Sequence, residues 1–200
     1  MSKPIAILIL AAGASTRMES TDKLLEVIDG QDLISLVTSR AYATGFPVFV
    51  AIATDKMERA KAIAHMPITI VPVANADEGM SASLRAGIRS LPKGLNGVLV
   101  MLADMPDITA DDLVTLLTHF AETGSDRVVR ATDATGHPGN PAIIPRRLFA
   151  KMKKLTGDTG ARAIFDQETV NLVRLPDGHA STDLDTPQDW VAWRAEQIEH

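Results

Sequence analysis

The sequence predicts an α/β fold with a mostly parallel sheet. Three observations carry this prediction. Apolar runs of strand length alternate with helix-like segments over roughly the first 120 residues. The first run, "PIAILIL" at residues 4–10, is apolar at every position, which is typical of a strand covered on both faces. After Gly124, short strands flank a loop rich in Gly, Pro and Asp, which indicates a small antiparallel element late in the chain.

Each strand expected in the first part of the chain is followed by an expected helix, as in βαβ units. Gly45 is a typical helix stop, and Thr109 is a candidate N-cap. We expect strands at residues 4–10, 46–53, 68–73 and 97–103, and helices at 32–44, 55–66, 80–91 and 108–122.

Later in the chain the expected strands and helices are shorter. We expect strands at residues 126–132, 141–145 and 170–175, a loop at 133–141, two short helical pieces before the last strand, and a terminal helix from about Pro187. With 200 residues and no repeat, linker or low-complexity tract, residues 1–200 are expected to form a single domain.

Composition narrows the classes of function. The absence of cysteine excludes disulfides, thiolate metal sites and a cysteine nucleophile, and favours a cytoplasmic setting. A formal charge of −5 and few aromatic residues argue against a nucleic-acid partner. The longest apolar run is far shorter than the ~20 residues of a membrane span, so we expect no membrane partner.

Three unusual segments directly follow expected parallel strands: residues 11–18, 74–87 and 103–106. In parallel α/β sheets, ligands bind beyond the carboxyl ends of the strands. These segments are therefore expected to meet at one crevice.

The first segment, "AAGASTRM", fits neither of the two familiar phosphate-binding loops. Its small residues and Gly13 allow the backbone N–H groups to approach an anion closely. Arg17 adds a bidentate phosphate donor, and Lys23 adds a mobile point charge. The alternative is an ordinary strand-to-helix connection with solvated charges.

Asp104 in "LADMP" follows an apolar run and should be partly desolvated, which is costly without a cation or hydrogen-bond donors. A Mg²⁺ ion that also contacts substrate phosphates is one such partner. The alternative is a carboxylate that caps the turn at Pro106.

Two further segments carry weaker signals. Gly79, Ser81 and Ser83 open an expected helix, where hydroxyl groups are common. Asp183 and Asp185 alternate in an extended segment, so both can point to one ion. The alternative for this region is that Thr186 and Pro187 simply start a helix.

Six strings in order, "LAAGASTRM" with Lys23, "NADEGMSASLRAG", "LADMP", "PGNPAIIP", "GDTGARAIF" and "DLDTPQD", together resemble the MobA-like nucleotidyltransferases. Within that family, the resemblance is to the molybdenum-cofactor cytidylyltransferases. It spans residues 10–189, and no single string is specific. It implies a three-layer, Rossmann-like nucleotide-diphospho-sugar transferase fold with a mixed, mostly parallel sheet.

The resemblance also implies roles for individual residues. Arg17, Lys23 and Asp104 would be catalytic, and Mg²⁺ would be held by Asp104 and by Asp185 rather than Asp183. The expected nucleotide-binding residues are Leu10, Ala11, Ala12, Gly13, Arg17, Lys23, Asn75, Gly79, Ser81 and Ser83. The expected acceptor-binding residues are Gly139, Asn140, Pro141, Asp158 and Gly160.

The implied reaction is transfer of CMP from CTP to the phosphate of molybdenum-bound molybdopterin, with release of pyrophosphate. A molybdenum hydroxylase is the expected recipient of the product. Ala12 stands where the guanylyl-transferring branch tends to carry a second glycine, which favours cytidine. The alternatives are another nucleotide, a sugar-phosphate or alcohol-phosphate acceptor, or a non-catalytic carrier of the cofactor.

Two positions depart from the family pattern. Glu19 replaces the glycine that usually follows the Arg-Met pair, and it places a carboxylate beside the expected triphosphate. Asp77 stands where relatives often carry an aromatic residue, which changes the expected base pocket.

Overall fold

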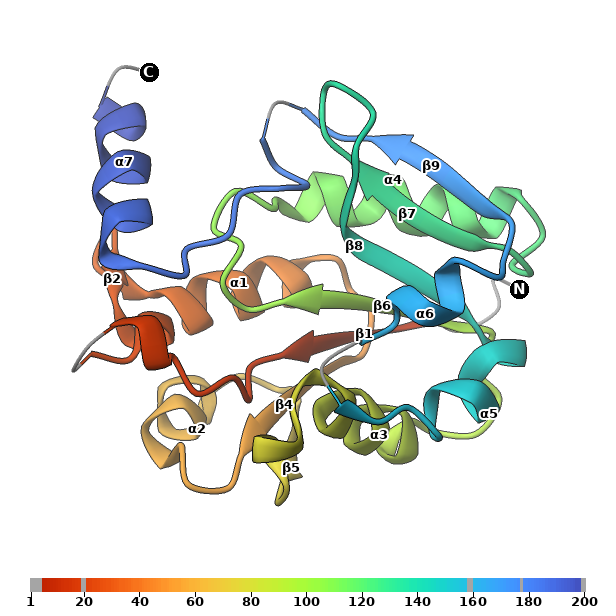
Figure 1. Cartoon of the computed structure of the whole chain (residues 1–200), viewed down its shortest axis with the longest axis horizontal. Helices are drawn as coiled ribbons and strands as arrows, with labels where there is room; N and C mark the ends of the chain where they lie inside the picture. The colour runs from red at the N-terminus through yellow and green to blue at the C-terminus, as the bar shows by residue number, and fades with distance from the viewer. Residues whose placement is uncertain (1–4, 19–20, 158–159, 177, 199–200) are drawn as a thin grey trace.

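The structure is a computed structural model that describes residues 5–18, 21–157, 160–176 and 178–198. A seven-stranded sheet lies between two layers of helices (Figure 1). Its strands are ordered β5-β4-β1-β6-β8-β7-β9. The strands are β1 (Ile5–Leu10), β4 (Val48–Ala53), β5 (Thr69–Val73), β6 (Gly97–Leu102), β7 (Val128–Thr132), β8 (Pro138–Pro145) and β9 (Val170–Arg174).

The connections contain the helices and one small hairpin. The α-helices are α1 (Leu33–Ala43), α2 (Met57–Ile63), α3 (Met80–Ser90), α4 (Ala110–Glu122), α5 (Phe149–Met152), α6 (Arg162–Phe165) and α7 (Pro187–Ile198). The 3₁₀ turns are η1 (Thr16–Met18), η2 (Lys23–Leu25), η3 (Ala76–Glu78) and η4 (Arg146–Leu148), and the hairpin is β2 (Val27–Ile28) with β3 (Gln31–Asp32). Of the helices in the part of the chain that the structure describes, none has the length and apolar character needed to cross a membrane.

The sheet is mixed and mostly parallel, as predicted. β5, β4, β1 and β6 pair in parallel, and β7 pairs in parallel with β9. β8 pairs antiparallel with both of its neighbours, β6 and β7. The carboxyl ends of β1, β4, β5 and β6 therefore lie at one edge of the sheet.

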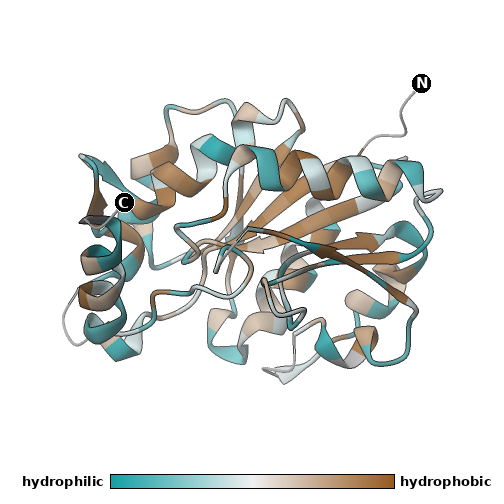
Figure 2. Cartoon of the chain, turned by 90° about the horizontal axis from the view of Figure 1, so that it is seen from above, coloured by the Kyte–Doolittle hydropathy of each residue, from teal (hydrophilic) through white to brown (hydrophobic). Residues whose placement is uncertain are grey.

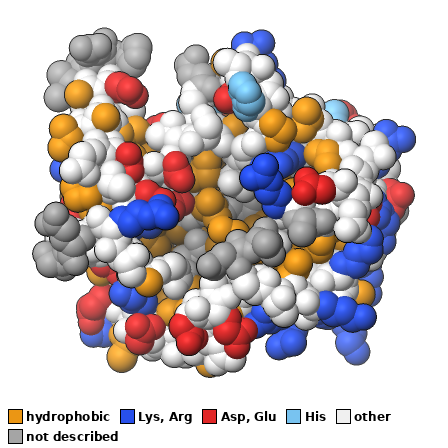
Figure 3. Space-filling model, viewed as in Figure 1, with side chains coloured by type: hydrophobic (Ala, Val, Ile, Leu, Met, Phe, Trp, Pro, Cys, Tyr) orange, Lys and Arg blue, Asp and Glu red, His pale blue; other side chains and the backbone are white. Residues whose placement is uncertain are grey.

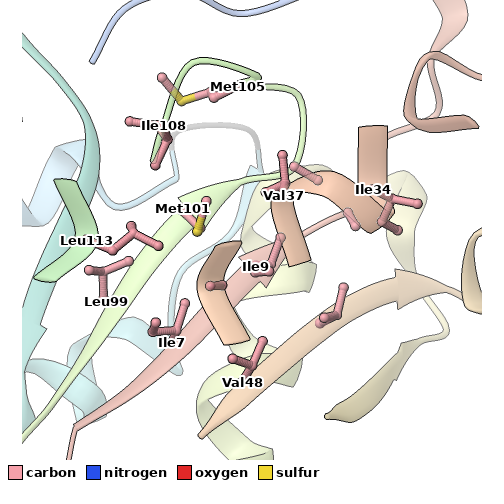
Figure 4. Close-up of a cluster of buried hydrophobic side chains, with 14 of the residues drawn as sticks. Ile7, Ile9, Ile34, Val37, Val48, Leu99, Met101, Met105, Ile108 and Leu113 are labelled. Carbon is pink, nitrogen blue, oxygen red and sulfur yellow. The ribbon is translucent and has the colours of Figure 1, made fainter. Parts of the chain in front are cut away.

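β1 is buried on both faces, which explains why its sequence is continuously apolar. Its odd-numbered residues join a core cluster with α1, α4 and α7, and its even-numbered residues join a second cluster with α3 and α5. Figure 4 shows Ile7 and Ile9 beside Leu99 of β6 and Val37 of α1. In Figure 2 the brown, hydrophobic strands lie between helices whose outer faces carry more polar residues.

A close contact sets where α3 lies. A Cβ added at Gly87 of α3 would lie 2.3 Å from Cδ2 of Leu8, so a larger residue there would require the Leu8 side chain to shift. α3 packs against the face of β1 that carries Leu8 and Leu10. The segment that begins at Gly79 therefore borders the loop that follows β1.

The structure confirms the predicted order of strands and helices. The predicted N-cap at Thr109 is present, because its side chain accepts a hydrogen bond from the N–H of Asp112, and Asp112 caps Thr109 in return. Gly45 follows α1 with φ +77°, which is the conformation expected of a helix stop.

Two local expectations were wrong, and one element was missed. α2 is shorter than the predicted 55–66, because the chain turns through i→i−3 hydrogen bonds at Ala64 and Met66 before Pro67. β8 begins at Pro138 instead of residue 141, because Pro138 pairs with Thr132 of β7. The β2–β3 hairpin was not predicted.

That hairpin has a clear local cause. Its two turn residues, Asp29 and Gly30, have φ values of 51° and 81°. Asp-Gly is a preferred pair for a hairpin turn with positive φ at both positions. The signal was present in the sequence, but each strand contains only two residues.

Candidate active site

A cleft of about 620 Å³ opens at the carboxyl ends of β1 and β6. Its volume lies within the usual range for small-molecule sites. Figure 3 shows this face hollowed, with hydrophobic side chains at the bottom and charged side chains of both signs around it. The three segments expected to converge do meet here, since the lining includes Leu10, Ala11, Ala12, Gly13, Arg17, Lys23, Gly79, Ser83 and Asp104.

Lys23 lies at the centre of the charged part of the cleft. Its Nζ donates to Oδ2 of Asp104 and to Oδ1 of Asp185, each at 2.5 Å. The side chain is only 11% exposed. Burial lowers the pKa of Lys23, but the charges and hydrogen bonds of Asp104 and Asp185 outweigh this effect and raise the pKa above its usual value.

Local structure places Lys23. Asp22 caps the short η2 turn, because its carboxylate accepts from the N–H of Leu24 at 3.1 Å. The same carboxylate accepts from Nε of Arg59 at 2.8 Å. Lys23 therefore projects from a turn that is fixed at its first residue.

Asp185 is brought to Asp104 across 81 positions of the sequence by backbone hydrogen bonds. The N–H of Leu184 donates to the carbonyl of Asp104 at 3.1 Å. At the start of α7, the Asp189 carboxylate accepts from the N–H groups of Asp185 at 3.1 Å and Thr186 at 2.7 Å. The segment before α7 is thus fixed at the end of β6.

Trp193 anchors α7 itself. It is 8% exposed, and its Nε1 donates to Asp107 at 2.8 Å. Its ring also packs edge-on against Trp190, with centroids 6.2 Å apart. Both tryptophans lie in the core, so the start of α7 is held at the cleft by packing as well as by hydrogen bonds.

Two further charged residues near Lys23, namely Arg17 and Asp183, differ in whether they form an ion pair. Arg17 forms an ion pair with Asp185, and its side chain is 70% exposed, so it is free to reorient. Asp183 makes no ion pair among the described residues. Partial desolvation and the negative charges of Asp104 and Asp185 raise the pKa of Asp183.

The carboxylate oxygens of Asp104 and Asp185 fit a divalent cation such as Mg²⁺. Oδ1 of Asp104 is buried and has no hydrogen-bond partner among the described residues. Asp104 and Asp185 lie close enough to share one ammonium group, so one cation can contact both. Within the described residues, no group of three or more acidic or histidine side chains is placed to hold a metal. Mg²⁺ typically uses only one or two carboxylates and takes its other ligands from water and phosphate.

Two residues expected at the nucleotide do not line this cleft. Ser81 is fully buried and donates its hydroxyl to the carbonyl of Gly157. Asn75 is exposed and donates to Oε1 of Glu78 at 3.1 Å. Ser81 thus links α3 to the segment before α6. Ser83, two residues further along the same helix, lines the cleft.

A second pocket of about 190 Å³ adjoins the cleft, with which it shares Leu10, Met80 and Leu102. Asn140 and Gly160, both expected at the acceptor, line it. Pro141 follows Asn140 in β8 and is buried. Asp158 and Glu19 lie outside the described residues.

Gly139 supports the wall of this pocket. A Cβ at Gly139 would lie 1.9 Å from the carbonyl oxygen of Ala180, so glycine is required for this contact. The neighbouring N–H of Asn140 donates to the same oxygen at 2.9 Å. Gly139 thus holds β8 against the segment that leads to Asp185.

Two arginines in this second pocket were missed in the sequence. Arg130 donates to the carbonyl of Gly139 at 2.8 Å and stacks over the ring of Phe165 at 5.5 Å. Burial, and then the nearby charge of Arg162, lower the pKa of Arg130. Because Arg130 lies on β7 and Arg162 on α6, no spacing in the sequence connects them.

Arg59 was also missed. Its side chain is completely buried, and it donates to the carbonyl of Ala11 at 2.6 Å, the carbonyl of Gly13 at 2.8 Å and Oγ of Ser15 at 2.9 Å. It also pairs with Asp22. In the sequence it is one of several charged residues on a short helix, so nothing marked it as buried.

Comparison with known proteins places this arrangement in a family. The model of the MobA-like NTP transferase domain matches residues 7–172, which is most of the chain. The chain belongs to the MobA-like NTP transferase family. The family resemblance expected from the motifs is confirmed, and the chain is a nucleotidyltransferase by family.

Two curated proteins are similar in sequence to this chain. The bifunctional protein GlmU of Micrococcus luteus is 31% identical over 150 residues, a match that covers 68% of this chain but only 30% of the GlmU chain. The chain therefore spans about a third of the length of such relatives. The purine catabolism protein PucB of Bacillus subtilis is 26% identical over 203 residues and is matched almost end to end, over 95% of this chain and 96% of PucB.

Solved structures show the same fold. The homologue of Mycobacterium tuberculosis Rv0371c from Mycobacterium sp. strain JC1 superposes with a TM-score of 0.84 at 24% identity, over 98% of this chain and 97% of that one. Rv0371c in complex with manganese gives 0.78 at 21%, over 94% and 97%. The molybdopterin-guanine dinucleotide biosynthesis protein A of Archaeoglobus fulgidus gives 0.71 at 17%, over 96% and 97%.

Asp189→Ala tests how Asp185 is held. The variant removes a cap from α7 and an acceptor from the N–H of Asp185, so the free energy of unfolding should fall by about 1 kcal/mol. Urea denaturation measures this change. Gln188→Ala, an exposed change in the same turn, is the control, and equal stability of the two variants would contradict the capping role.

The loss of stability in Asp189→Ala should also depend on pH. Hydrogen bonds from Thr186 hold the pKa of Asp189 below its usual value. A lowered pKa in the folded state stabilises the fold above about pH 4, and the contribution disappears as the pH falls through the lowered value.

Proposed function

We propose that this nucleotidyltransferase transfers CMP from CTP to the phosphate group of a molybdopterin-type acceptor, with Mg²⁺ as cofactor. The observation that carries the proposal is the convergence of Lys23, Asp104 and Asp185 at one end of the cleft. Two acids and a lysine that meet beside a small-residue loop suit a metal-bound triphosphate. The product is expected to pass to a molybdenum hydroxylase in the cytoplasm.

Asp104 and Asp185 would hold the ion, and Oδ1 of Asp104, which is buried and has no hydrogen-bond partner among the described residues, supports this role. A bound ion would neutralise charge that develops on the phosphates. The manganese complex of Rv0371c is consistent with a divalent ion in this fold. Lys23, released from the two carboxylates, would move to the phosphates together with Arg17.

The proposed nucleotidyl transfer needs few protein groups besides these. An oxygen of the acceptor phosphate forms a bond to the α-phosphorus, and the bond between that phosphorus and the bridging oxygen to the β-phosphate breaks. The electron pair leaves with pyrophosphate, whose charge Arg17 and Lys23 stabilise. A phosphate oxygen is already a nucleophile, so no general base is required. Catalysis consists of positioning and electrostatic stabilisation.

The second pocket supports an acceptor with an anionic group. Arg130 and Arg162 line it together with Asn140 and Gly160. Among the described residues neither arginine forms a salt bridge, although the charge of Asp166 acts on Arg130. It shares Leu10, Met80 and Leu102 with the cleft, so an acceptor bound there would adjoin the triphosphate. The choice of a molybdopterin acceptor rests on the sequence motifs and on the fold shared with the biosynthesis protein of Archaeoglobus fulgidus.

A screen of the four nucleoside triphosphates against several acceptors, with and without Mg²⁺, tests the proposal. Pyrophosphate release should be greatest with CTP and molybdenum-bound molybdopterin and should require the ion. Release with a sugar phosphate or an alcohol phosphate, but not with molybdopterin, would contradict the assigned acceptor. Binding of the cofactor without any consumption of CTP would indicate a carrier protein.

Asp104→Ala tests the metal-binding role. The variant removes one of two proposed ligands, so turnover should fall at least ~10²-fold, as when one preorganised electrostatic group is lost. That factor corresponds to about 2.7 kcal/mol of barrier. Steady-state pyrophosphate release measures it.

The matched control is Asp183→Ala, which removes an acid from the same region that makes no ion pair among the described residues. Its turnover should stay within roughly threefold of the wild type. Near-normal turnover in a folded Asp104→Ala protein would refute the metal-binding role of Asp104.

A further inference from the structure

Arg59 of α2 is the largest fully buried polar side chain described in the structure, and the reaction proposed above does not use it directly. In Figure 1, α2 lies beside the loop that follows β1. The guanidinium group projects under that loop, residues 11–18, which is called the first loop below. A buried guanidinium is costly unless its donors and its charge are satisfied.

The first loop and Asp22 accept the hydrogen bonds of the Arg59 guanidinium. Nη1 of Arg59 donates to the carbonyls of Ala11 and Gly13, and Nη2 donates to Oγ of Ser15. Nε donates to the Asp22 carboxylate, which balances the charge. One rigid, planar group therefore holds the loop at several points.

These hydrogen bonds decide which backbone groups face the cleft. In a planar trans peptide, the carbonyl and the N–H point in opposite directions. The carbonyl of Ala11 shares its peptide with the N–H of Ala12, and the carbonyl of Gly13 shares its peptide with the N–H of Ala14. With both carbonyls turned toward Arg59, both N–H groups point away from it, to the side where Ala12 and Ala14 line the cleft.

Those two N–H groups are available. Within the described residues, neither Ala12 nor Ala14 donates its N–H to an acceptor, whereas the N–H of Ala11 is used in the sheet. Ser15, next in the chain, has φ +57°, a conformation that a non-glycine residue keeps only when its surroundings hold it. Its bond to Arg59 is one such restraint.

We infer that Arg59 is a positioning residue for nucleotide binding: it turns the carbonyls of the first loop inward so that the N–H groups of Ala12 and Ala14 bind the phosphates of the nucleotide. The inference rests on the proposed function. It adds a residue that touches no substrate and acts through the loop. Without Arg59, a carbonyl oxygen that turned into the cleft would face the phosphates and repel them.

Arg59→Lys tests the inference while keeping the positive charge beside Asp22. A lysine ammonium cannot reach the carbonyls, the hydroxyl and the carboxylate at once. The dissociation constant for Mg–CTP, measured by calorimetry, should rise at least roughly tenfold, and that for magnesium pyrophosphate should rise by a similar factor, because the effect lies at the phosphates. The control is Arg89→Lys, an exposed position on α3, which should bind both ligands as the wild type does.

A second measurement needs no variant. In ¹⁵N-labelled wild-type protein, the amide resonances of Ala12 and Ala14 should shift when magnesium pyrophosphate is added, while the Nε resonance of the Arg59 guanidinium should stay in place. In folded Arg59→Lys, the amide shifts should shrink at saturating ligand. A merely structural role would lower the melting temperature without this selective loss.

The outcomes separate the two proposals. If folded Arg59→Lys binds Mg–CTP as tightly as the wild type, the inference fails and the proposed function stands. If the wild type binds CTP but the amides of Ala12 and Ala14 do not respond to pyrophosphate, the inference also fails alone. If the wild type binds neither ligand, the proposed function fails and the inference falls with it.

Discussion

The shared contact of the Lys23 ammonium with Asp104 and Asp185 is the interaction on which the rest of the site depends. Two carboxylates that lie this close repel one another unless a cation stands between them. The protein supplies that cation from its own chain, on a turn capped by Asp22. The strand order of the sheet, the contact between Leu184 and Asp104 and the cap at the start of α7 all serve to bring these groups together.

This arrangement connects stability with the proposed chemistry. Lys23 keeps the two acids in place before any ligand arrives, so the site does not have to be assembled on binding. In the proposed reaction, a metal-bound triphosphate would exchange one cation for another and bring phosphates that attract the displaced ammonium. Arg59 has a comparable role on the other side of the first loop, where a buried charge fixes backbone groups instead of carboxylates. In the proposed reaction both cations would act by preorganisation, and preorganised electrostatic stabilisation is usually the largest single contribution to catalysis.

Much of the fold and part of the site could be predicted from the sequence. The apolar run of β1, the Thr109 cap and the unusual strand ends are local signals, and the parallel sheet then implies that the strand ends converge. Such local signals do not predict contacts between residues that are far apart in the sequence. Nothing local shows that Arg59 is buried, that Ser81 turns toward Gly157 or that Arg130 and Arg162 share a pocket, because each depends on packing between elements far apart in the sequence. The position of Asp185 beside Asp104 was expected from the family resemblance alone.

The most direct test of the account is a crystal structure with CTP and Mn²⁺, in which anomalous scattering locates the ion. We expect one ion bound directly by the carboxylates of Asp104 and Asp185, with Nζ of Lys23 moved from these carboxylates to a phosphate oxygen of CTP. An ion that touches neither carboxylate, or a nucleotide bound away from the first loop while Lys23 still bridges the two acids, would contradict it.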